Sequence, residues 1–392
     1  MKEGWTYKKL GEVCDFEGGS QPPKSEWINH PQDGYVRMLQ IRDFTKSRNA
    51  EIEYVKITKK LRLCKADDIL IGRYGASVGK ILTGLAGAYN VAIIKSIPDE
   101  NIVRKEFIRR YFESPLFQSI LFKVCTSRAA QAGFSKDDIK DELIPIPSLS
   151  DQQSIVDYLD SAFAKIDTMK ANAEKALNEA KALFQASLKE MLEPKEGWEE
   201  KTLKEVCSLI TDGTHHSPLN DESGKYKYIT AKNIRTWGLD LKNITYVSEE
   251  VHKEIIARCN PQKGDVLYIK DGATTGIAIV NPLEEEFSML SSVALIKPNK
   301  DVLSSEFLCY TLNSPSIYRQ TRNQMDGAAI TRVTLVKIKG FVISIPPLFE
   351  QQSIVITLDS LKSKVDRLQE NFDKISQECD ALKQALLRQV FE

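Results

Sequence analysis

The chain has 392 residues, of which 42% are hydrophobic, so it is long enough for two or more domains with buried cores. Its 54 basic residues balance its 54 acidic residues, which excludes a simple polycation and confines any nucleic-acid surface to a local patch. No run approaches about 18 consecutive apolar residues, and the start lacks an apolar segment. We therefore expect neither a transmembrane helix nor a signal peptide.

Cysteine and histidine usage favours a reduced, cytoplasmic protein without a metal site. The seven cysteines are an odd number and form no C-x-x-C pair. None of the four histidines stands at a metal-ligand spacing from a cysteine, and the one cluster, His215-His216, is typical of a surface loop.

Residues 1–147 are predicted to form a globular domain of mixed α+β type. Short β-rich runs at 35–39, 69–71 and 91–94 alternate with glycine-containing turns, and a helix is expected at about 103–122. Ile146-Pro147 closes the domain, because proline stops the element that precedes it.

A glycine-rich segment at 72–80 (GRYGASVGK) invites comparison with a phosphate-binding loop. The spacing fails, because the glycine at 75 precedes Gly79-Lys80 by four positions instead of five. Ile81 also stands where a serine or threonine would bind magnesium. We predict instead a glycine turn between paired strands that presents polar side chains on one side.

Residues 148–195 are predicted to form a long helix. Ser148-Leu149-Ser150-Asp151 resembles a capping box at its start. Glu193-Pro194-Lys195 ends it with almost no linker before the next domain.

Residues 196–346 repeat the first domain, and residues 347–392 repeat its helix. Gly4-Trp5 recurs as Gly197-Trp198, and the β-rich runs recur at 228–229, 266–269 and 293–296. The shorter helix recurs at about 304–322, and the closing pair recurs as Ile345-Pro346. The offset between the copies drifts only from about 190 to 200, which indicates a tandem duplication.

The second long stretch carries a coiled-coil heptad, because its apolar residues follow one another in steps of four and three. Shifted back by 199 positions, the first stretch has a matching seam whose middle is built from small residues, among them Ala162 and Ala176. We expect the two helices to pair with each other rather than act as separate core or oligomerisation helices. The predicted seam consists of Ile155, Leu159, Ile166, Leu183, Ile354, Leu358, Leu361, Val365, Leu368, Phe372, Ile375, Leu382 and Leu386.

No catalytic set is visible in the sequence. It contains neither G-x-S-x-G nor H-E-x-x-H, and it lacks the Asn/Asp-Pro-Pro-Tyr/Phe run of adenine methyltransferases. An enzyme that uses the glycine loops is one alternative interpretation. A coiled-coil scaffold that recognises RNA or protein is another.

Loops rich in Arg, Lys, Gln, Asn and aromatic residues occupy equivalent places in the two halves. Such side chains can contact base edges and phosphates. In the first half the candidates are Gln21, Lys24, Arg42, Lys46, Arg48, Arg73, Tyr74, Ser77, Lys80, Arg128, Gln131 and Lys136. In the second half they are Thr214, His215, His216, Lys232, Asn233, Arg235, Lys270, Thr274, Arg322, Asn323, Gln324 and Arg332.

The order domain, long helix, domain, long helix resembles the DNA specificity (S) subunit of type I restriction-modification systems over the whole chain. Each helix opening, Asp151-Gln152-Gln153 after Pro147 and Glu350-Gln351-Gln352 after Pro346, is similar to the family's Pro-x-x-x-Glu-Gln motif. The first copy departs from it by Asp151 in place of glutamate. The Gly-Trp-x-x-x-x-Leu runs at 4–10 and 197–203 also look like the start of the family's target recognition domains.

The resemblance implies that each globular domain reads one part of an interrupted sequence in double-stranded DNA. The helices would pair antiparallel as a spacer and dock two modification subunits, which bring S-adenosylmethionine and methylate adenine at N6. A separate restriction subunit would use ATP and magnesium. The chain itself would be non-catalytic, with no cofactor, metal or membrane partner of its own.

Overall fold

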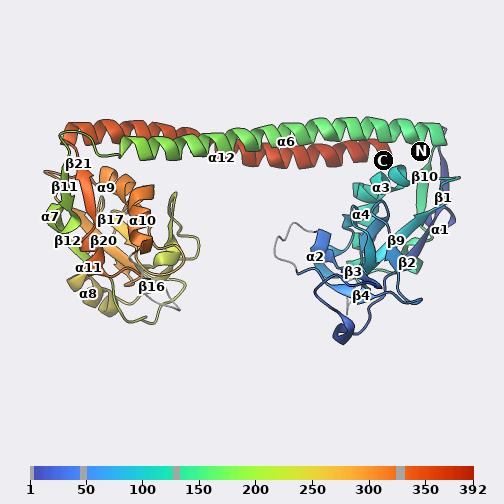
Figure 1. Cartoon of the computed structure of the whole chain (residues 1–392), viewed down its shortest axis with the longest axis horizontal. Coiled ribbons are helices and arrows are strands. Elements are labelled where there is room, and N and C mark those ends of the chain that lie inside the picture. Colours follow the sequence, from blue (N-terminus) through green and yellow to red (C-terminus); the bar gives the residue numbers. More distant parts are fainter. Residues whose placement is uncertain (1–3, 45–50, 127–132, 324–331) are drawn as a thin grey trace. The chain divides into compact units, whose positions relative to one another are not determined.

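The computed structural model describes residues 4–44, 51–126, 133–323 and 332–392 (Figure 1). The chain divides into two compact units, Met1–Ala173 with Phe372–Glu392, and Glu174–Asn371. Each unit holds one globular domain together with parts of both long helices. Within the described ranges, no helix combines the length and apolarity that a membrane crossing requires.

The globular domain of the first unit contains two four-stranded sheets and one two-stranded sheet, ordered β2-β9-β6-β7, β4-β3-β8-β5 and β1-β10. Its strands are β1 (Thr6–Lys9), β2 (Cys14–Gly18), β3 (Tyr35–Leu39), β4 (Tyr54–Lys56), β5 (Leu63–Cys64), β6 (Ile69–Gly72), β7 (Ile81–Leu82), β8 (Gly87–Tyr89), β9 (Ile93–Pro98) and β10 (Leu143–Ile146). Its helices are α1 (Leu10–Val13), α2 (Ile41–Phe44), α3 (Lys105–Glu113), α4 (Pro115–Thr126) and α5 (Lys136–Ile139), with 3-10 turns at Lys24–Glu26 and Gly75–Ser77.

The globular domain of the second unit repeats this plan, with sheets ordered β12-β20-β17-β18, β16-β13-β19, β11-β21 and β14-β15. Its strands are β11 (Glu199–Thr202), β12 (Cys207–Asp212), β13 (Tyr226–Ile229), β14 (Ile234–Arg235), β15 (Gly238–Leu239), β16 (Thr245–Val247), β17 (Val266–Ile269), β18 (Ala278–Val280), β19 (Phe287–Met289), β20 (Val293–Pro298) and β21 (Val342–Ile345). Its helices are α7 (Leu203–Val206), α8 (Glu249–Arg258), α9 (Ser305–Leu312), α10 (Pro315–Asn323) and α11 (Leu335–Lys339), with a 3-10 turn at Ala231–Asn233.

The continuous apolar runs of the central strands reflect burial on both faces of a sheet. In β6, Ile69 and Ile71 pack into the cluster that contains the helical residue Phe107, whereas Leu70 points to the opposite cluster with Tyr89. In β17, Val266 and Tyr268 likewise pack into one core cluster, whereas Leu267 and Ile269 pack into another on the opposite face. The predicted α+β class with duplicated domains is therefore confirmed.

The prediction of one helix at about 103–122, and of its counterpart at 304–322, was wrong in one respect. Each region forms two helices that break at a Ser-Pro step, α3 and α4 at Ser114-Pro115 and α9 and α10 at Ser314-Pro315. Ser114 adopts extended backbone angles (φ −73°, ψ 148°), which are the angles that a following proline favours. The proline then occupies the first turn of the next helix, where its missing N–H costs no hydrogen bond.

Strand β9 begins later than predicted. The run at 91–94 was aligned with 293–296, but β9 spans Ile93–Pro98 and matches β20, Val293–Pro298. Val91 is exposed and lies in the turn before the strand. Two apolar residues in this turn made the strand look longer than it is.

The two long helices, α6 (Leu149–Met191) and α12 (Leu348–Phe391), lie side by side and antiparallel within each unit (Figure 1). In the first unit, Lys170 Nζ lies 3.2 Å from Asp380, and Lys383 Nζ lies 2.6 Å from Asp167, so residue numbers fall along one helix as they rise along the other. In the second unit, Leu188 near the end of α6 shares a core cluster with Leu358 near the start of α12. The predicted pairing and its direction are confirmed within each unit.

The buried seam of α6 agrees with the predicted one at Ile155, Leu159 and Ile166 and differs from it toward the end of the helix. Phe163 and Leu177 are buried and Phe184 is half-buried, whereas the predicted seam residue Leu183 is 61% exposed. Apolar residues stand next to each other at several of these positions, as in Ala162-Phe163 and Ala176-Leu177. The larger member faces the partner helix because its burial removes more apolar surface from water. Of the predicted small residues, Ala173 and Ala180 are half-buried, whereas Ala176 is exposed and gives way to Leu177.

The seam of α12 agrees with the prediction from Ile354 to Ile375 and at Leu386, where each predicted residue is buried or half-buried, but near its end it also takes in the next residue. The predicted residue Leu382 is 48% exposed, while Leu387 is almost fully buried. A straight helix drifts by about 20° per heptad against a strict 3.5-residue repeat. Over the four heptads from Ile354 to Leu382 the drift approaches the angle between neighbouring residues, so the contact extends to the next side chain.

This correction predicts opposite outcomes for two leucines of the second unit. Leu177→Ala should lower the free energy of unfolding by about 2–5 kcal/mol, because Leu177 is only 4% exposed and its removal leaves a cavity. Leu183→Ala should change it by less than about 0.5 kcal/mol, as exposed substitutions do. Urea unfolding of both variants measures the difference, and a larger loss for Leu183→Ala would restore the predicted seam.

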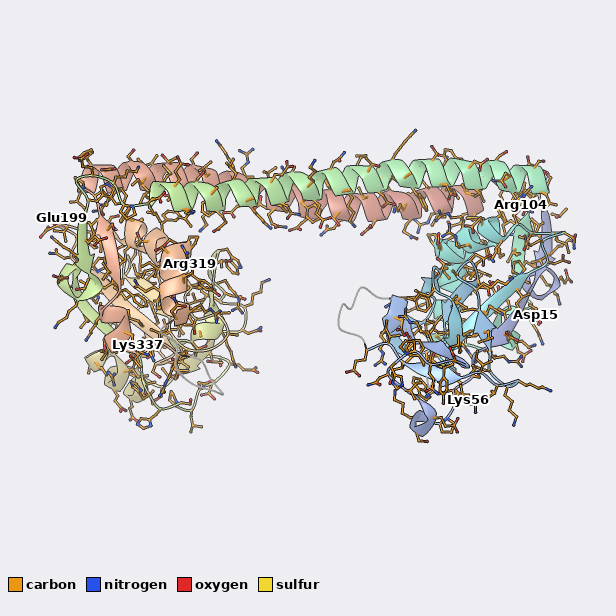
Figure 2. All side chains as sticks on the ribbon, viewed as in Figure 1. Asp15, Lys56, Arg104, Glu199, Arg319 and Lys337 are labelled. Carbon is orange, nitrogen blue, oxygen red and sulfur yellow. The ribbon has the colours of Figure 1, made fainter. Side chains whose placement is uncertain are left out.

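One buried glutamine joins each globular domain to its long helix. Gln152 Oε1 accepts a hydrogen bond from the Arg104 backbone N–H at 2.7 Å, and its Nε2 donates to the carbonyls of Ile102 and Pro147 at 3.0 Å each. Arg104 lies directly beside the coil (Figure 2). Gln351 makes the same three bonds in the second unit, with the N–H of Ser304 and two backbone carbonyls at 2.8–2.9 Å. The glutamine of each helix opening therefore fixes the helix to the loop before α3 or α9.

Candidate nucleic-acid interface

Four segments of the first domain converge on the turn at 90–92, which precedes β9. They are the ends of β2 and β3, the glycine-rich loop that follows β6, and residues 133–134 before α5. Four backbone hydrogen bonds of 2.9–3.3 Å join these segments. The N–H of Ser20 donates to the Tyr89 carbonyl and the N–H of Asn90 to that of Leu39. The N–H of Arg73 donates to the Ala92 carbonyl and the N–H of Phe134 to that of Arg73. We call this set of loops the first loop edge.

The second domain builds the same arrangement around the turn at 290–292. Four backbone hydrogen bonds of 2.9–3.0 Å join the equivalent segments. The N–H of Thr214 donates to the Met289 carbonyl and the N–H of Leu290 to that of Ile229. The N–H of Lys270 donates to the Ser292 carbonyl and the N–H of Val333 to that of Lys270. We call this set of loops the second loop edge. The frame repeats between the domains, while the side chains that it presents differ.

Glycine makes the close passage of each loop possible. A Cβ atom on Gly19 would lie 2.0 Å from the Asn90 carbonyl oxygen, and one on Gly213 would lie 1.9 Å from that of Met289. Any other residue at these two positions would push the loop after β2 or β12 away from its edge. Gly19 and Gly213 occupy equivalent positions in the two domains, so the loop after β2 and the loop after β12 approach their turns in the same way.

The first loop edge brings together the predicted residues Gln21, Arg42, Arg73, Tyr74 and Ser77. Arg73 is fixed, because its Nε donates to the Phe134 carbonyl at 3.1 Å and its guanidinium lies over the Tyr74 ring. Arg42 Nη2 donates to Glu53 at 2.6 Å. Lys80, at the end of the glycine-rich loop, is exposed. The structure therefore brings together loops that are far apart in the sequence.

Two other predicted residues of the first domain lie beside this set, because Lys24 shares the Glu53 carboxylate with Arg42 and Lys136 lines one hollow together with Arg62 and Arg73. Lys24 stands over the Trp27 ring and pairs with Glu53, and Lys136 begins α5, 3.9 Å from Asp15. Some predicted residues of both domains fall outside the described ranges, namely Lys46, Arg48, Arg128, Gln131 and Gln324.

The second loop edge carries Thr214, His215, Lys232, Thr274 and Arg332, all of which are exposed except the half-buried Thr214. Arg332 forms an isolated bridge with Asp271 at the start of the glycine-containing turn. His216 follows His215 in the loop after β12. Arg235 lies 3.8 Å from Asp240 in the β14–β15 hairpin. Arg322 and Asn323 end α10, where Arg322 Nε donates to the Tyr318 hydroxyl at 2.9 Å.

Two predicted contact residues of the second domain are structural. Asn233 is buried, its Oδ1 accepts from the Thr230 N–H at 3.0 Å, and its amide donates to the Asp240 carbonyl. Lys270 is buried between Asp212 and Asp271, at 3.5 and 3.3 Å. Neither side chain is exposed to a partner. Their local sequences could not reveal this, because the groups that enclose them come from other segments.

Each loop edge also holds an arginine that was not predicted from the sequence. In the second domain, Asp212 at the end of β12 is 1% exposed and accepts from Arg258 Nη2 at 2.7 Å, and the same nitrogen lies 3.1 Å from His215 Nε2. In the first domain, Glu17 near the end of β2 accepts from Arg62 Nη1 at 2.8 Å and from the Tyr89 hydroxyl at 2.9 Å. The acid and the base of each pair are far apart along the chain, so the sequence alone does not reveal that they pair.

The pKa of Glu17 is set mainly by groups other than Arg62. Burial opposes ionisation of this carboxyl, but hydrogen bonds from Tyr89 and Lys95 and the charges of Lys95 and Arg62 outweigh it. The pKa of Glu17 is therefore held below its usual range, and the carboxylate is charged at neutral pH.

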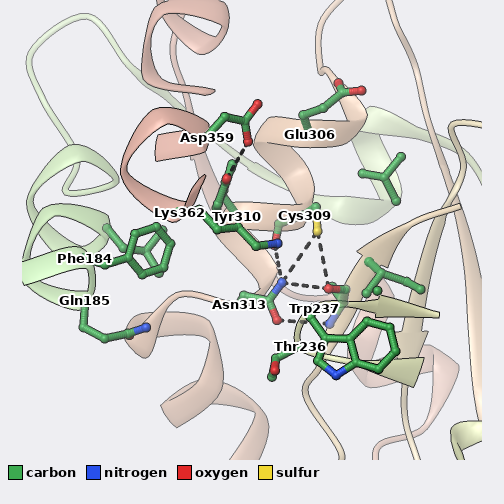
Figure 3. A pocket seen from close by; sticks show the side chains of 15 residues that line it. Phe184, Gln185, Thr236, Trp237, Glu306, Cys309, Tyr310, Asn313, Asp359 and Lys362 are labelled. Atoms are coloured by element: carbon green, nitrogen blue, oxygen red, sulfur yellow. Dashed lines mark hydrogen bonds between the residues drawn. The ribbon is translucent and has the colours of Figure 1, made fainter. Parts of the chain in front are cut away.

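A cavity of about 370 Å³ lies in the second unit between the β14–β15 hairpin, α9 and the two long helices (Figure 3). The Tyr310 hydroxyl donates to Asp359 at 2.6 Å on one side of it, and Cys309 lines another. Burial raises the pKa of the Cys309 thiol to about 12, so this sulfur is protonated and a poor nucleophile at neutral pH. Among the residues that the structure describes, no three His, Cys, Asp or Glu side chains gather as a metal site.

Comparison with known proteins identifies the family. The model of the type I restriction modification DNA specificity domain matches this chain twice, over residues 2–179 and 195–377. The chain belongs to this family. The two matches follow the duplication seen in the sequence, and each includes one loop edge of the specificity-domain fold.

Curated members of the specificity-domain family are similar over nearly their whole length. The EcoBI specificity subunit of Escherichia coli is 23% identical, with 100% of this chain and 86% of that protein covered. The EcoKI specificity subunit of Escherichia coli strain K12 is 22% identical, with 100% and 89% covered. The MjaVIII specificity subunit of Methanocaldococcus jannaschii is 21% identical, with 93% and 88% covered.

Solved structures share the fold. A chain from a structure on complex assembly and conformational transition of the type I R-M system has a TM-score of 0.76 and 20% identity, with 100% of this chain and 98% of that chain covered. The HsdS subunit from Thermoanaerobacter tengcongensis has a TM-score of 0.58 and 19% identity, with 100% and 97% covered. The tandem specificity-domain architecture therefore holds at low sequence identity.

Proposed function

We propose that this chain is the sequence-specific DNA recognition subunit of a type I restriction-modification complex. Each globular domain reads one half of an interrupted double-stranded target through its loop edge. The observation that carries the proposal is the repetition of one loop frame in both domains with different side chains on it. Two equivalent frames with unlike side chains suit two unlike half-sites.

The long helices act as the spacer between the two half-sites and as the docking site for two modification subunits. These partners hold S-adenosylmethionine and methylate adenine at N6, and a restriction subunit uses ATP and magnesium. This chain contributes binding and orientation rather than a chemical step. The failed phosphate-loop spacing and the protonated Cys309 thiol support this division. A DNA target places the complex in the cytoplasm.

The decisive experiment compares DNA methylation in cells with and without this chain. One interrupted adenine-methylated motif should disappear when the chain is removed. Exchange of residues 196–346 for the second domain of another family member should then change one half of the motif and leave the other half intact. A change in both halves would contradict modular reading. An unchanged methylome would favour a scaffold that binds RNA or protein.

A further inference from the structure

The arginine at each loop edge combines a fixed position with free hydrogen-bonding capacity. The side chains of Arg62 and Arg258 are 54% and 52% exposed, although each makes a short ion pair. Each uses one terminal nitrogen for its carboxylate. The remaining guanidinium nitrogens of both side chains have no hydrogen-bond partner within the described parts of the chain.

The two pairs lie at the same end of matching strands but not at equivalent positions, because Glu17 is opposite Lys95 whereas Asp212 is opposite Ala294, one residue further along its strand. The acid stands near the end of β2 in one domain and at the end of β12 in the other, and both strands pair antiparallel with the strand after the turn, β9 or β20. The backbone N–H of Arg62 donates to Ser20 Oγ at 2.9 Å, which ties it to the loop after β2. Arg258 ends α8, beside the loop after β12.

We propose that Arg62 and Arg258 are specificity-determining residues, each of which reads a guanine in the major groove of its own half-site. The inference rests on the proposed function. Arginine contacts guanine through two parallel hydrogen bonds to O6 and N7, which requires a planar fork held in one orientation. The carboxylates of Glu17 and Asp212 supply that orientation before DNA binds, so less side-chain entropy is lost on binding.

The neighbouring carboxylate also argues for a base rather than a phosphate as the partner. A phosphate bound to the same guanidinium would approach Glu17 or Asp212, and two negative charges this close repel each other. The edge of guanine is uncharged and offers two acceptors to the guanidinium nitrogens. His215 lies beside the Arg258 fork and extends the polar surface of the second edge.

The test measures binding of the complete complex to duplexes that carry its methylated motif, with each G·C pair replaced in turn. The wild-type complex should lose affinity by about 10- to 100-fold at one guanine in each half. Arg258→Ala should reduce this loss to within about 3-fold at one position of one half, and Arg62→Ala should do so in the other half. Arg258→Lys keeps the charge without the planar fork, so it should discriminate as poorly as the alanine variant.

Two lysines provide matched controls, because each substitution removes one exposed positive charge from the same domain without touching the arginine–carboxylate pair. Lys56 on β4 (Figure 2) lies opposite Tyr35 at the start of β3. Lys253 lies in the middle of α8, where it pairs with Glu249 on its own helix. Lys56→Ala and Lys253→Ala should leave discrimination unchanged at every position.

Unchanged discrimination in both arginine variants would overturn the inference and leave the proposed function standing. A uniform loss of affinity for all duplexes would also overturn it, because that is the behaviour of a phosphate contact. A wild-type complex that selects no sequence would instead overturn the proposed function.

Discussion

Replacement of Gln152 by alanine is expected to destabilise the first unit by about 3–5 kcal/mol. The side chain is fully buried and satisfies one backbone N–H and two backbone carbonyls. Alanine would leave these three groups buried without partners, at a cost of about 1–3 kcal/mol each before relaxation. Gln351→Ala should have a similar effect on the second unit, because Gln351 makes the same three bonds. Urea unfolding measures both losses.

The adjacent glutamines are matched controls. Gln352 is exposed and Gln153 is half-buried, and Gln153 donates only to Asp157 on its own helix. Their alanine variants should change the free energy of unfolding by less than about 0.5 kcal/mol. Gln152→Glu keeps an acceptor for the Arg104 N–H but loses the two donated bonds, so it should also destabilise. Equal losses at Gln152 and Gln153 would contradict a role for the buried glutamine at the junction.

The Gln-Gln pair at each helix opening illustrates what the sequence can and cannot reveal. The repeated motif was visible in the sequence, and it indicated where each long helix begins. Which glutamine faces the domain follows only from the position of the loop at 102–104 or 302–304, which supplies the bonded groups. Those loops are about 50 residues away along the chain, so no local pattern assigns the two roles.

The duplication and the long helices were predictable because they depend on short-range repetition. β17 matches the predicted run at 266–269, and the antiparallel pairing agrees within each unit. The later part of the α6 seam was not predictable by alignment with α12, because two neighbouring apolar residues could each face the partner helix. Side-chain volume decided between them, as Leu177 and Leu183 show.

The candidate site was harder to predict than the fold. The sequence pointed to polar loops, and several of their residues do meet at the two loop edges. Lys270 and Asn233 had suitable side chains, but their charge and amide groups are used inside the domain. Arg62 and Arg258 were missed, because an arginine in an ordinary sequence context gives no sign of the buried or half-buried carboxylate that fixes it.

Replacement of Phe391 by alanine is expected to destabilise the first unit by about 3–5 kcal/mol, although the residue stands next to the C-terminus. Its ring is only 4% exposed and lies 5.4 Å from the Phe107 ring and 5.5 Å from the Tyr111 ring, both on α3. The end of α12 therefore completes the core of the first domain, and its loss leaves a cavity between α3 and the coil. Phe349→Ala is the matched control, because Phe349 lies on the same helix with its side chain exposed. Urea unfolding should show a large loss for Phe391→Ala and less than about 0.5 kcal/mol for Phe349→Ala. Similar values for the two variants would mean that the first domain is stable without the second long helix.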